Sequence, residues 1–281
     1  MKNLIINADD FGRHVSINQA VIQGFAHGCI RSASIMPNCD AFEDAVKQAS
    51  GHTDLGIGVH FTLVGETPLL PHGQVSSLVG QDGKFYSDYI GFVKKFFLRK
   101  IKLSEIYAEL NAQMQKVKRT GLTVTHIDSH QHMHVLPGVI DVVLGVAREN
   151  NIDAIRIPKI PVNFTGGYNC SIGQCVGRTG LSFLAELAKW KAKKAGFRVP
   201  DYFSGIVAGE AVTEDCLNEI IDGMKNGVTE VMLHPGKNNA LLHKDCGWHH
   251  NFEVEFQAVM SENILKKLSS RNIKLISFKD L

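Results

Sequence analysis

Short runs of apolar and β-branched residues alternate with longer amphipathic segments along the whole chain. Runs of the first kind are typical of buried strands, and segments of the second kind are typical of helices that cover a sheet. The pattern predicts strands at residues 3–8, 31–37, 54–63, 123–129, 154–158, 202–208, 229–235 and 273–278. It predicts helices near residues 16–27, 40–50, 104–119, 136–150, 181–195, 214–225 and 253–271.

Regular alternation of strand and helix predicts an α/β fold built on a parallel sheet. Seven or eight strands in one domain favour a (β/α) barrel of the TIM type, distorted or incomplete, and an open doubly wound sheet is the alternative. A chain of 281 residues suits a single barrel domain over residues 1–281. Two segments, 64–100 and 159–180, interrupt the alternation and are predicted to be long loops that serve as lids, binding loops or interface elements.

Composition and charge narrow the class of partner. Lys and Arg number 30 against 28 Asp and Glu, so the formal charge is +2 and no basic surface for nucleic acid or membrane is expected. The sequence also lacks a run of about 18 apolar residues, so no membrane span is expected. The start, MKNLIINADD, is too short and too polar for a signal peptide, and six scattered cysteines without a CxxC pair are typical of reduced thiols. We therefore expect a cytoplasmic protein that acts on a small molecule.

Unusual polar residues lie at the ends of four predicted strands. Asp9 and Asp10 follow the first strand, His60 comes late in the third, a run of histidines ends the fourth, and His234 ends the seventh. In parallel α/β folds the ligand site lies at the carboxyl ends of the strands. These four segments are therefore expected to meet at one site.

The histidine run, HIDSHQHMH, places ligand-type side chains at every second position. A half-buried strand rarely has imidazoles at three alternate inward positions without a functional reason. On a straight strand the first and last of the five would stand roughly 26 Å apart, so one ion cannot bind them all. Spacing alone leaves open which one or two bind, while the others support the ligands or contact substrate. The five residues are His126, Asp128, His130, His132 and His134.

Aspartate and histidine without thiolates form a ligand set that suits Zn²⁺, Mg²⁺, Mn²⁺ or Co²⁺. Such an ion can activate water for attack on a carbonyl or phosphoryl centre. A rival metal cluster is HKDCGWHH, whose His243, Cys246, His249 and His250 have the spacing of a zinc knuckle. It lacks a second, distant pair of ligands and lies in a polar stretch, so a surface loop is the preferred interpretation.

Five ordered blocks of sequence resemble the YdjC-like carbohydrate deacetylases: IINADDFG at 5–12, GVHFTLVGETPL at 58–69, THIDSHQHMHVLP at 125–137, IRIP at 155–158 and LHPG at 233–236. The resemblance implies a distorted (β/α) barrel and one divalent ion, Mg²⁺ or Zn²⁺. It implies that Asp10, His60 and His130 hold this ion, that Asp9 is the general base and that His234 is the general acid. The remaining residues of the blocks would contact substrate or support the ligands: His126, Asp128, His132, His134 and Arg156.

The implied reaction is hydrolysis of an N-acetyl group on an amino sugar or a short chitooligosaccharide, which yields acetate and a free amine. One alternative is a metal-dependent amidohydrolase that acts on another amide, such as a cyclic one. Another is a metal-dependent sugar-binding protein without turnover, although the expected base and acid are both present. The sugar, its length and the roles of the two long loops are left open.

Aromatic residues in segment 64–100 could serve either of two purposes. Phe85, Tyr86 and Tyr89 could offer flat apolar faces to a sugar ring, or they could pack against the barrel or a second subunit. The segment leaves directly from the strand that carries His60. We expect it to help close the site, and we expect the protein to be a homodimer.

Overall fold

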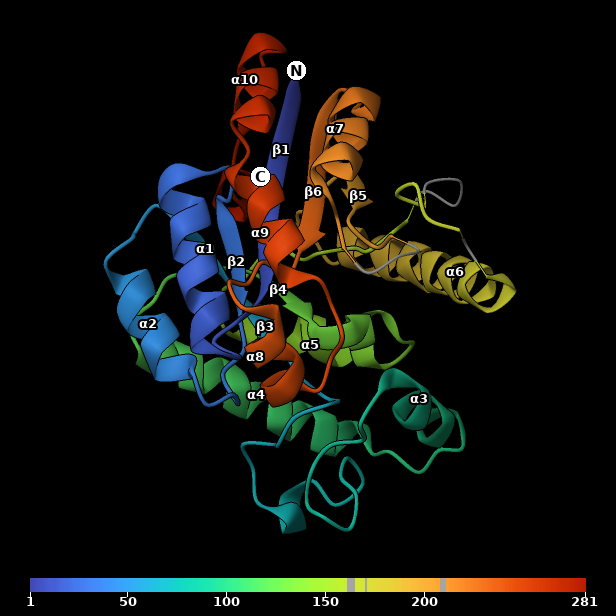
Figure 1. The fold of residues 1–281 in the computed structure, drawn as a ribbon. Helices are drawn as coiled ribbons and strands as arrows, with labels where there is room; N and C mark the ends of the chain where they lie inside the picture. Colours follow the sequence, from blue (N-terminus) through green and yellow to red (C-terminus); the bar gives the residue numbers. More distant parts are fainter. Residues whose placement is uncertain (161–164, 170, 208–210) are drawn as a thin grey trace.

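A computed structural model describes residues 1–160, 165–169, 171–207 and 211–281 (Figure 1). Its strands are β1 (Lys2–Phe11), β2 (Ser32–Ile35), β3 (Gly56–Phe61), β4 (Val124–Ser129), β5 (Tyr202–Ser204), β6 (Gly227–Leu233) and β7 (Lys274–Leu275). Its helices are α1 (Val15–His27), α2 (Phe42–Ser50), α3 (Tyr89–Phe97), α4 (Leu103–Arg119), α5 (Val139–Glu149), α6 (Ile172–Lys194), α7 (Glu214–Gly223), α8 (Asn239–Cys246), α9 (Phe252–Met260) and α10 (Glu262–Ser270).

The strands form one parallel sheet in the order β4-β3-β2-β1-β6-β5, and β7 pairs with the start of β1. Every pair of strands is parallel, as the alternation of strand and helix predicted. Between β4 and β5 the described chain makes only isolated bridges, from Ile127 to Ile155 and from Ala154 to Arg198. The sheet is thus a curved parallel half-barrel, consistent with the distorted TIM-like barrel that the sequence predicted.

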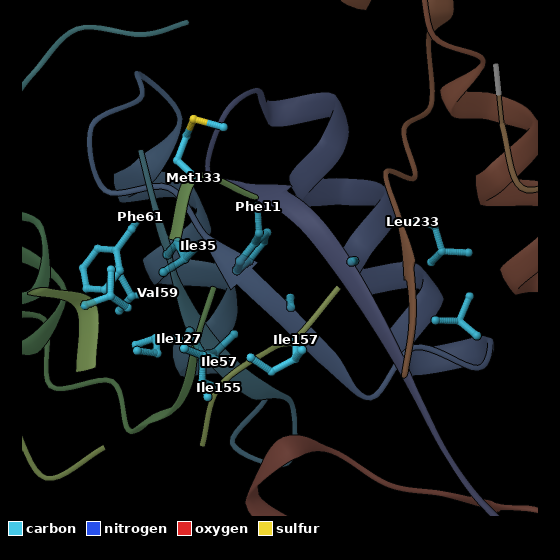
Figure 2. Packing of buried hydrophobic residues seen from close by; sticks show 14 of the residues in the cluster. Phe11, Ile35, Ile57, Val59, Phe61, Ile127, Met133, Ile155, Ile157 and Leu233 are labelled. Carbon is cyan, nitrogen blue, oxygen red and sulfur yellow. The ribbon is translucent and has the colours of Figure 1, made fainter. Parts of the chain in front are cut away.

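The two faces of the sheet differ in chemistry because successive strand residues point to opposite sides. The outer face packs under the helices with apolar side chains, and Figure 2 shows ten labelled members of this core, among them Ile57, Val59 and Ile127. At the base of the inner face, Ile5, Ala154, Ile276 and Phe278 form a small separate apolar cluster. Above that base the inner face is mainly polar, although Phe203 and Met232 are also buried there. Its buried polar members are Asn7, Ser34, His60, His126, Asp128 and Glu230.

Most predicted strands and helices are confirmed within a few residues, and the differences have local causes. The predicted strand at 154–158 is wrong, because this segment makes only the isolated bridges. The predicted helix at 253–271 is two helices, since the Ser261 side chain accepts a hydrogen bond from the amide of Ile264 and begins α10 there. Residue 208 of the predicted strand at 202–208 lies outside the described residues, and β5 ends at Ser204.

Both predicted long loops contain helix. Segment 64–100 includes α3, which begins where the Asp88 side chain accepts a hydrogen bond from the amide of Gly91. The prediction of a loop over 159–180 is wrong from residue 172 onward, because α6 begins there with a capping box made by Ser171 and Gln174. Residues 161–164 and 170 of that segment lie outside the described residues. In Figure 1, α6 extends away from the sheet.

The expectations of no membrane span and of reduced cysteines concern the whole chain. None of the described helices has the length and apolar character that crossing a membrane requires. Five of the six cysteines lie in the described part of the chain, and all five are free thiols. Cys170 lies outside it.

Candidate metal and catalytic site

Asp9 and Asp10 both reach the inner face at the end of β1, although neighbouring residues of a regular strand point to opposite faces. The pairing of β1 with β2 shifts register between Ala8 and Phe11. Asp10 adopts a left-handed backbone with φ of 60°, a conformation that non-glycine residues rarely take. This local break lets two adjacent carboxylates share one buried site.

Asp10, His60 and His130 come together from three different strand ends. Oδ1 of Asp10 lies 3.1 Å from Nδ1 of His130 and 3.5 Å from Nε2 of His60. All three side chains are buried, and one ligand atom from each lies within 4.8 Å of the others. Burial alone would raise the pKa of Asp10, but His130 and Arg13 outweigh it and hold this pKa well below its usual value. A carboxylate oxygen and two imidazole nitrogens therefore face one small volume.

Asp128 orients His60 within this group. Nδ1 of His60 lies 2.8 Å from Oδ1 of Asp128, which leaves Nε2 directed toward Asp10. Burial would lower the pKa of His60, but the Asp128 carboxylate outweighs it and raises that pKa. The other oxygen of Asp128 accepts a hydrogen bond from Ser34 at 2.7 Å. A carboxylate behind an imidazole is the arrangement that commonly fixes histidine ligands of metals.

Arg156 holds the Asp9 carboxylate in place. Its two terminal nitrogens each donate to one oxygen of Asp9 at 2.6 Å, so the guanidinium holds the carboxylate at both oxygens. Nε of Arg156 donates to Glu230 at 2.6 Å, and one terminal nitrogen lies 2.8 Å from Asp128. Burial would lower the pKa of Arg156, but the surrounding carboxylates outweigh it and raise this pKa well above its usual value. Asp9 is therefore rigidly placed beside the three candidate ligands.

A second group of side chains, Asp9, His60 and Asp128, is also close enough to hold an ion. Its two carboxylates already accept hydrogen bonds from Arg156 or Ser34, and the fixed positive charge of Arg156 lies against both. Arg13 pairs with Oδ2 of Asp10 at 2.9 Å and leaves Oδ1 of that residue facing His60 and His130. The set of Asp10, His60 and His130 is thus the better fit for a divalent cation, and its donor chemistry suits Zn²⁺ or a similar ion.

The histidine run divides after His130 because the chain stops being a strand. β4 ends at Ser129, and residues 130–135 form a 3₁₀ turn in which Gln131 and His132 have φ of 51° and 57°. His134 turns back to Ser129 at 2.6 Å and to the carbonyl of Arg156 at 3.0 Å. Burial lowers the pKa of His134 to about 4, so this side chain acts as a neutral brace of the turn.

His126 and His132 lie outside the candidate ligand set. The His126 ring stacks on Phe278 with centroids 3.8 Å apart and fills the space above Gly58, where a Cβ atom would lie 2.3 Å from the ring. Burial lowers the pKa of His126 to about 3, and its link to the site runs through Ser34. His132 packs its edge against Phe203, and its buried Nδ1 has no hydrogen-bond partner among the described residues.

His234 follows β6 on the other side of the site and is partly exposed. Its ring meets Trp248 edge to face at 4.9 Å, and its Nδ1 lies 3.9 Å from Glu255. Burial lowers the pKa of His234, although the negative charges of Asp10 and Asp9 oppose that effect. The imidazole is therefore within electrostatic reach of the two aspartates.

Sequence reasoning missed several buried partners of this site. Asn7 donates to Asp9 at 2.8 Å and to Ser34 at 2.9 Å, and Glu230 accepts from Arg156. Glu66 holds Arg13 at 2.9 Å. A signal was present for Glu230, because a charged residue directly before the apolar run Val231–Leu233 of a predicted strand is unusual.

A cavity of about 620 Å³ opens beside Arg13, at the carboxyl ends of β1, β2 and β3. Its lining is rich in polar groups, which suits a ligand with many hydroxyls. A wider hollow of about 910 Å³ lies near Met1 at the opposite end of β1, and it contains none of the aspartates or histidines described above. The polar residues of the first cavity are Arg13, His14, Asn38, Asp40, Glu66, Thr67, Lys84 and Asp245.

The aromatic residues of segment 64–100 have different surroundings. Phe85 is buried in the core, and Tyr86 donates to the Ser77 carbonyl at 3.2 Å while Lys95 lies 4.4 Å over its ring. Tyr89 is 49% exposed, and its amide donates to Gln131 at 2.8 Å, next to His130. Tyr89 is thus the one of these three aromatics that remains open to a ligand.

Comparison with known proteins places this arrangement in context. A family model described as YdjC-like protein matches residues 3–270. A carbohydrate deacetylase of Thermoanaerobacter pseudethanolicus is 30% identical over 278 residues, which cover 99% of this chain and 98% of the relative. A carbohydrate deacetylase of Geobacillus stearothermophilus is 29% identical over 98% of this chain and 96% of the relative. A crystal structure from Enterococcus faecalis, of a candidate cellobiose-phosphate cleavage protein, matches with a TM-score of 0.79 and 26% identity, over 99% of this chain and 98% of that one.

Proposed function

The chain belongs to the YdjC-like protein family, and from this membership and the geometry of the site we propose that it is a metal-dependent hydrolase that removes N-acetyl groups from amino sugars or short chitooligosaccharides. The observation that carries the proposal is the grouping of Asp10, His60 and His130 between a fixed carboxylate, Asp9, and a partly exposed imidazole, His234. Amide hydrolysis needs a proton acceptor and a proton donor, and this site offers one of each.

Asp10, His60 and His130 would hold the ion. A divalent cation bound there would lower the pKa of water and polarise the acetyl carbonyl. Asp128 keeps Nε2 of His60 available by occupying its Nδ1, and Arg13 keeps Asp10 ionised. These contacts prepare the ligand set before the ion arrives, which lowers the cost of binding it.

Asp9 serves as the general base in this proposal. Arg156 and Asn7 fix its carboxylate. Oδ1 accepts a hydrogen bond from each of them, whereas Oδ2 accepts only from Arg156 and keeps a lone pair for a proton. Oδ2 of Asp9 lies 3.9 Å from Nε2 of His60, so the base lies beside the candidate ligands. From there it takes the proton of the attacking water.

His234 serves as the general acid, because an amide nitrogen leaves only when it is protonated. Its partly exposed ring can reach substrate, whereas His126 and His134 are buried and already bonded. After the proton transfer the products are acetate and a free amino sugar.

Two features support a carbohydrate as the substrate class. Curated relatives that match nearly the whole chain are named carbohydrate deacetylases. The polar cavity beside Arg13 offers charged and amide side chains that can bond sugar hydroxyls, and one of its walls, Arg13, contacts the candidate ligand Asp10. The cavity therefore lies where a sugar could present its N-acetyl group to the site.

Acetate release from N-acetylglucosamine and its short β-1,4 oligomers tests the proposal against its two alternatives. The protein is stripped of metal and resupplied with Zn²⁺, Mg²⁺, Mn²⁺ or Co²⁺ singly, and a cyclic amide is assayed in parallel. We expect acetate from at least one acetylated sugar and no opening of the cyclic amide. Turnover of the cyclic amide alone would favour the amidohydrolase, and sugar binding without acetate would favour the binding protein.

A further inference from the structure

A separate group of ligand-type side chains lies next to the Asp10 set and consists of His234, His250 and Glu255. One ligand atom from each lies within 4.8 Å of the others. Nε2 of His250 is 3.2 Å from Oε2 of Glu255, and Nδ1 of His234 is 3.9 Å from the same oxygen. Two imidazoles and one carboxylate are the ligand types that zinc sites use.

Glu255 is a rigid and ionised member of this group. It is buried, its Oε1 accepts a hydrogen bond from the amide of Val212 at 2.7 Å, and its Oε2 accepts one from the amide of His234. Hydrogen bonds from two backbone N–H groups favour the ionised form of this carboxylate. A fixed negative charge therefore lies between the two imidazoles.

His250 is the member whose bonding is incomplete. Its side chain is 7% exposed, and its ring is clamped between Trp248, stacked at 4.3 Å, and the edge of Phe252 at 4.9 Å. Nε2 points toward Glu255 but is not aligned for a hydrogen bond, and this buried nitrogen has no hydrogen-bond partner among the described residues. Buried polar atoms rarely stay unpaired, so a missing ligand is a physical explanation.

We propose that His234, His250 and Glu255 form a second divalent-cation site, selective for Zn²⁺, which is separate from the Asp10 set. Imidazole and carboxylate ligands favour zinc over Mg²⁺, which prefers oxygen ligands only. The zinc-knuckle spacing of residues 243–250 does not provide this site. His243 instead bonds the His250 carbonyl at 2.7 Å, and His249 is exposed.

Occupation of this site inhibits the hydrolase, a consequence that rests on the proposed function. An ion on His234 occupies the nitrogen that must carry the ring's second proton, so the ring cannot become the imidazolium that protonates the leaving amine. Loss of a general acid reduces turnover on the order of a hundredfold. Excess Zn²⁺ therefore counteracts the activation that the first ion provides.

The test is the number of zinc ions bound per chain in a zinc-buffered solution, with turnover measured on the same samples. We expect two ions for the wild type and one for each of Asp10→Asn, His250→Gln and His234→Gln. His249→Gln is the matched control, since its exposed ring is one residue from His250, and it should still bind two. Because His234 is partly exposed, its variant keeps the test informative if His250→Gln fails to fold.

Turnover supplies the second readout. In the wild type, turnover should rise to a maximum near one ion per chain and fall as the second ion binds. In His250→Gln, turnover should reach its maximum and then stay there as more Zn²⁺ is added. A wild type that binds one ion, or a second ion lost in His249→Gln but kept in His250→Gln, would overturn the proposal. If no acetylated sugar is hydrolysed, the proposed function fails, but the ion count still decides whether the second site exists.

Discussion

Nδ1 of His60 lies 2.8 Å from Oδ1 of Asp128, and both side chains are buried on the inner face of the sheet. The charge of Arg156 outweighs burial and holds the pKa of Asp128 far below its usual value. The ionised carboxylate can only accept, so Nδ1 of His60 carries a hydrogen, and in the neutral ring, the form that binds a metal, Nε2 keeps its lone pair. That lone pair faces Asp10 at 3.5 Å.

Substitution of Asp128 tests this orienting role. Asp128→Asn removes the charge behind His60, so we expect the affinity for a divalent ion to fall roughly 10- to 100-fold while the protein remains folded. Competition with a chromophoric chelator measures the affinity. Asp54→Asn is a control on a side chain that is 92% exposed. Equal affinities in the two variants would show that Asp128 does not prepare the ligand.

Matched substitutions of Asp9 and Asp10 should have different effects on turnover and metal content. Asp9→Asn cannot take up the proton of water, so we expect turnover to fall by on the order of 10²–10⁴ while metal content stays near that of the wild type. Asp10→Asn should instead lose the ion. Atomic absorption on both variants, with acetate release, distinguishes them. Metal loss from Asp9→Asn would mean that the two aspartates have exchanged roles.

The histidine run offers a matched pair of substitutions. His126→Ala removes a ring stacked on Phe278, so we expect a loss of roughly 2–4 kcal/mol in the free energy of unfolding with little effect on metal affinity. His130→Ala should instead greatly reduce metal affinity and have little effect on the free energy of unfolding. Urea unfolding and chelator competition measure the two effects. A large loss of metal affinity in His126→Ala would contradict the assignment.

The histidine run shows which features of the site could be predicted from the sequence and which could not. Alternation of side chains predicted β4 correctly, but it carried the strand geometry past Ser129, where two left-handed residues end the strand. Gln131 and His132 are not residue types that announce a left-handed turn as glycine does. The selection of His130 therefore came from family resemblance, and strand spacing could not have supplied it.

Two further features, the start of α6 and the cluster around His234, were not predicted because the sequence has only weak signals for them. The start of α6 was missed because its first turns contain three glycines and a threonine, which lower helix propensity, and the capping box at Ser171 was the available signal. His250 and Glu255 meet His234 only through the path of the chain between 234 and 255. No spacing rule links them, and so the second cluster could be found only in three dimensions.

Glu230 should make stability depend on pH. Burial, which exceeds the opposing effect of Arg156, raises the pKa of Glu230 from 4.5 to about 7 in the folded protein. A raised pKa stabilises the fold below the unfolded value of 4.5, and this contribution is lost as pH rises through about 7. For the metal-free protein we expect a loss of up to about 3 kcal/mol from this residue, which Glu230→Gln removes.

Urea unfolding of wild type and Glu230→Gln across this pH range measures the effect. The difference between their free energies of unfolding should move in favour of the variant as pH rises. Parallel curves for the two proteins would show that Glu230 remains ionised in the fold, paired with Arg156.

Tyr89 tests the role of segment 64–100. If this exposed ring packs on a sugar, Tyr89→Ala should raise KM several-fold for an oligosaccharide, equivalent to about 1 kcal/mol, and should spare metal binding. Ile90→Ala, an exposed neighbour on α3, is the control. Unchanged kinetics together with a shift from dimer to monomer in sedimentation would assign the segment to assembly instead.

Acetate release during titration of metal-stripped protein with one divalent ion is the most direct test of the central claim, that Asp10, His60 and His130 hold the ion on which amide hydrolysis depends. We expect no release from the stripped protein, recovery that reaches its maximum near one ion per chain, and no recovery in His130→Ala. Full release by the stripped protein, or equal recovery in His130→Ala, would contradict the claim.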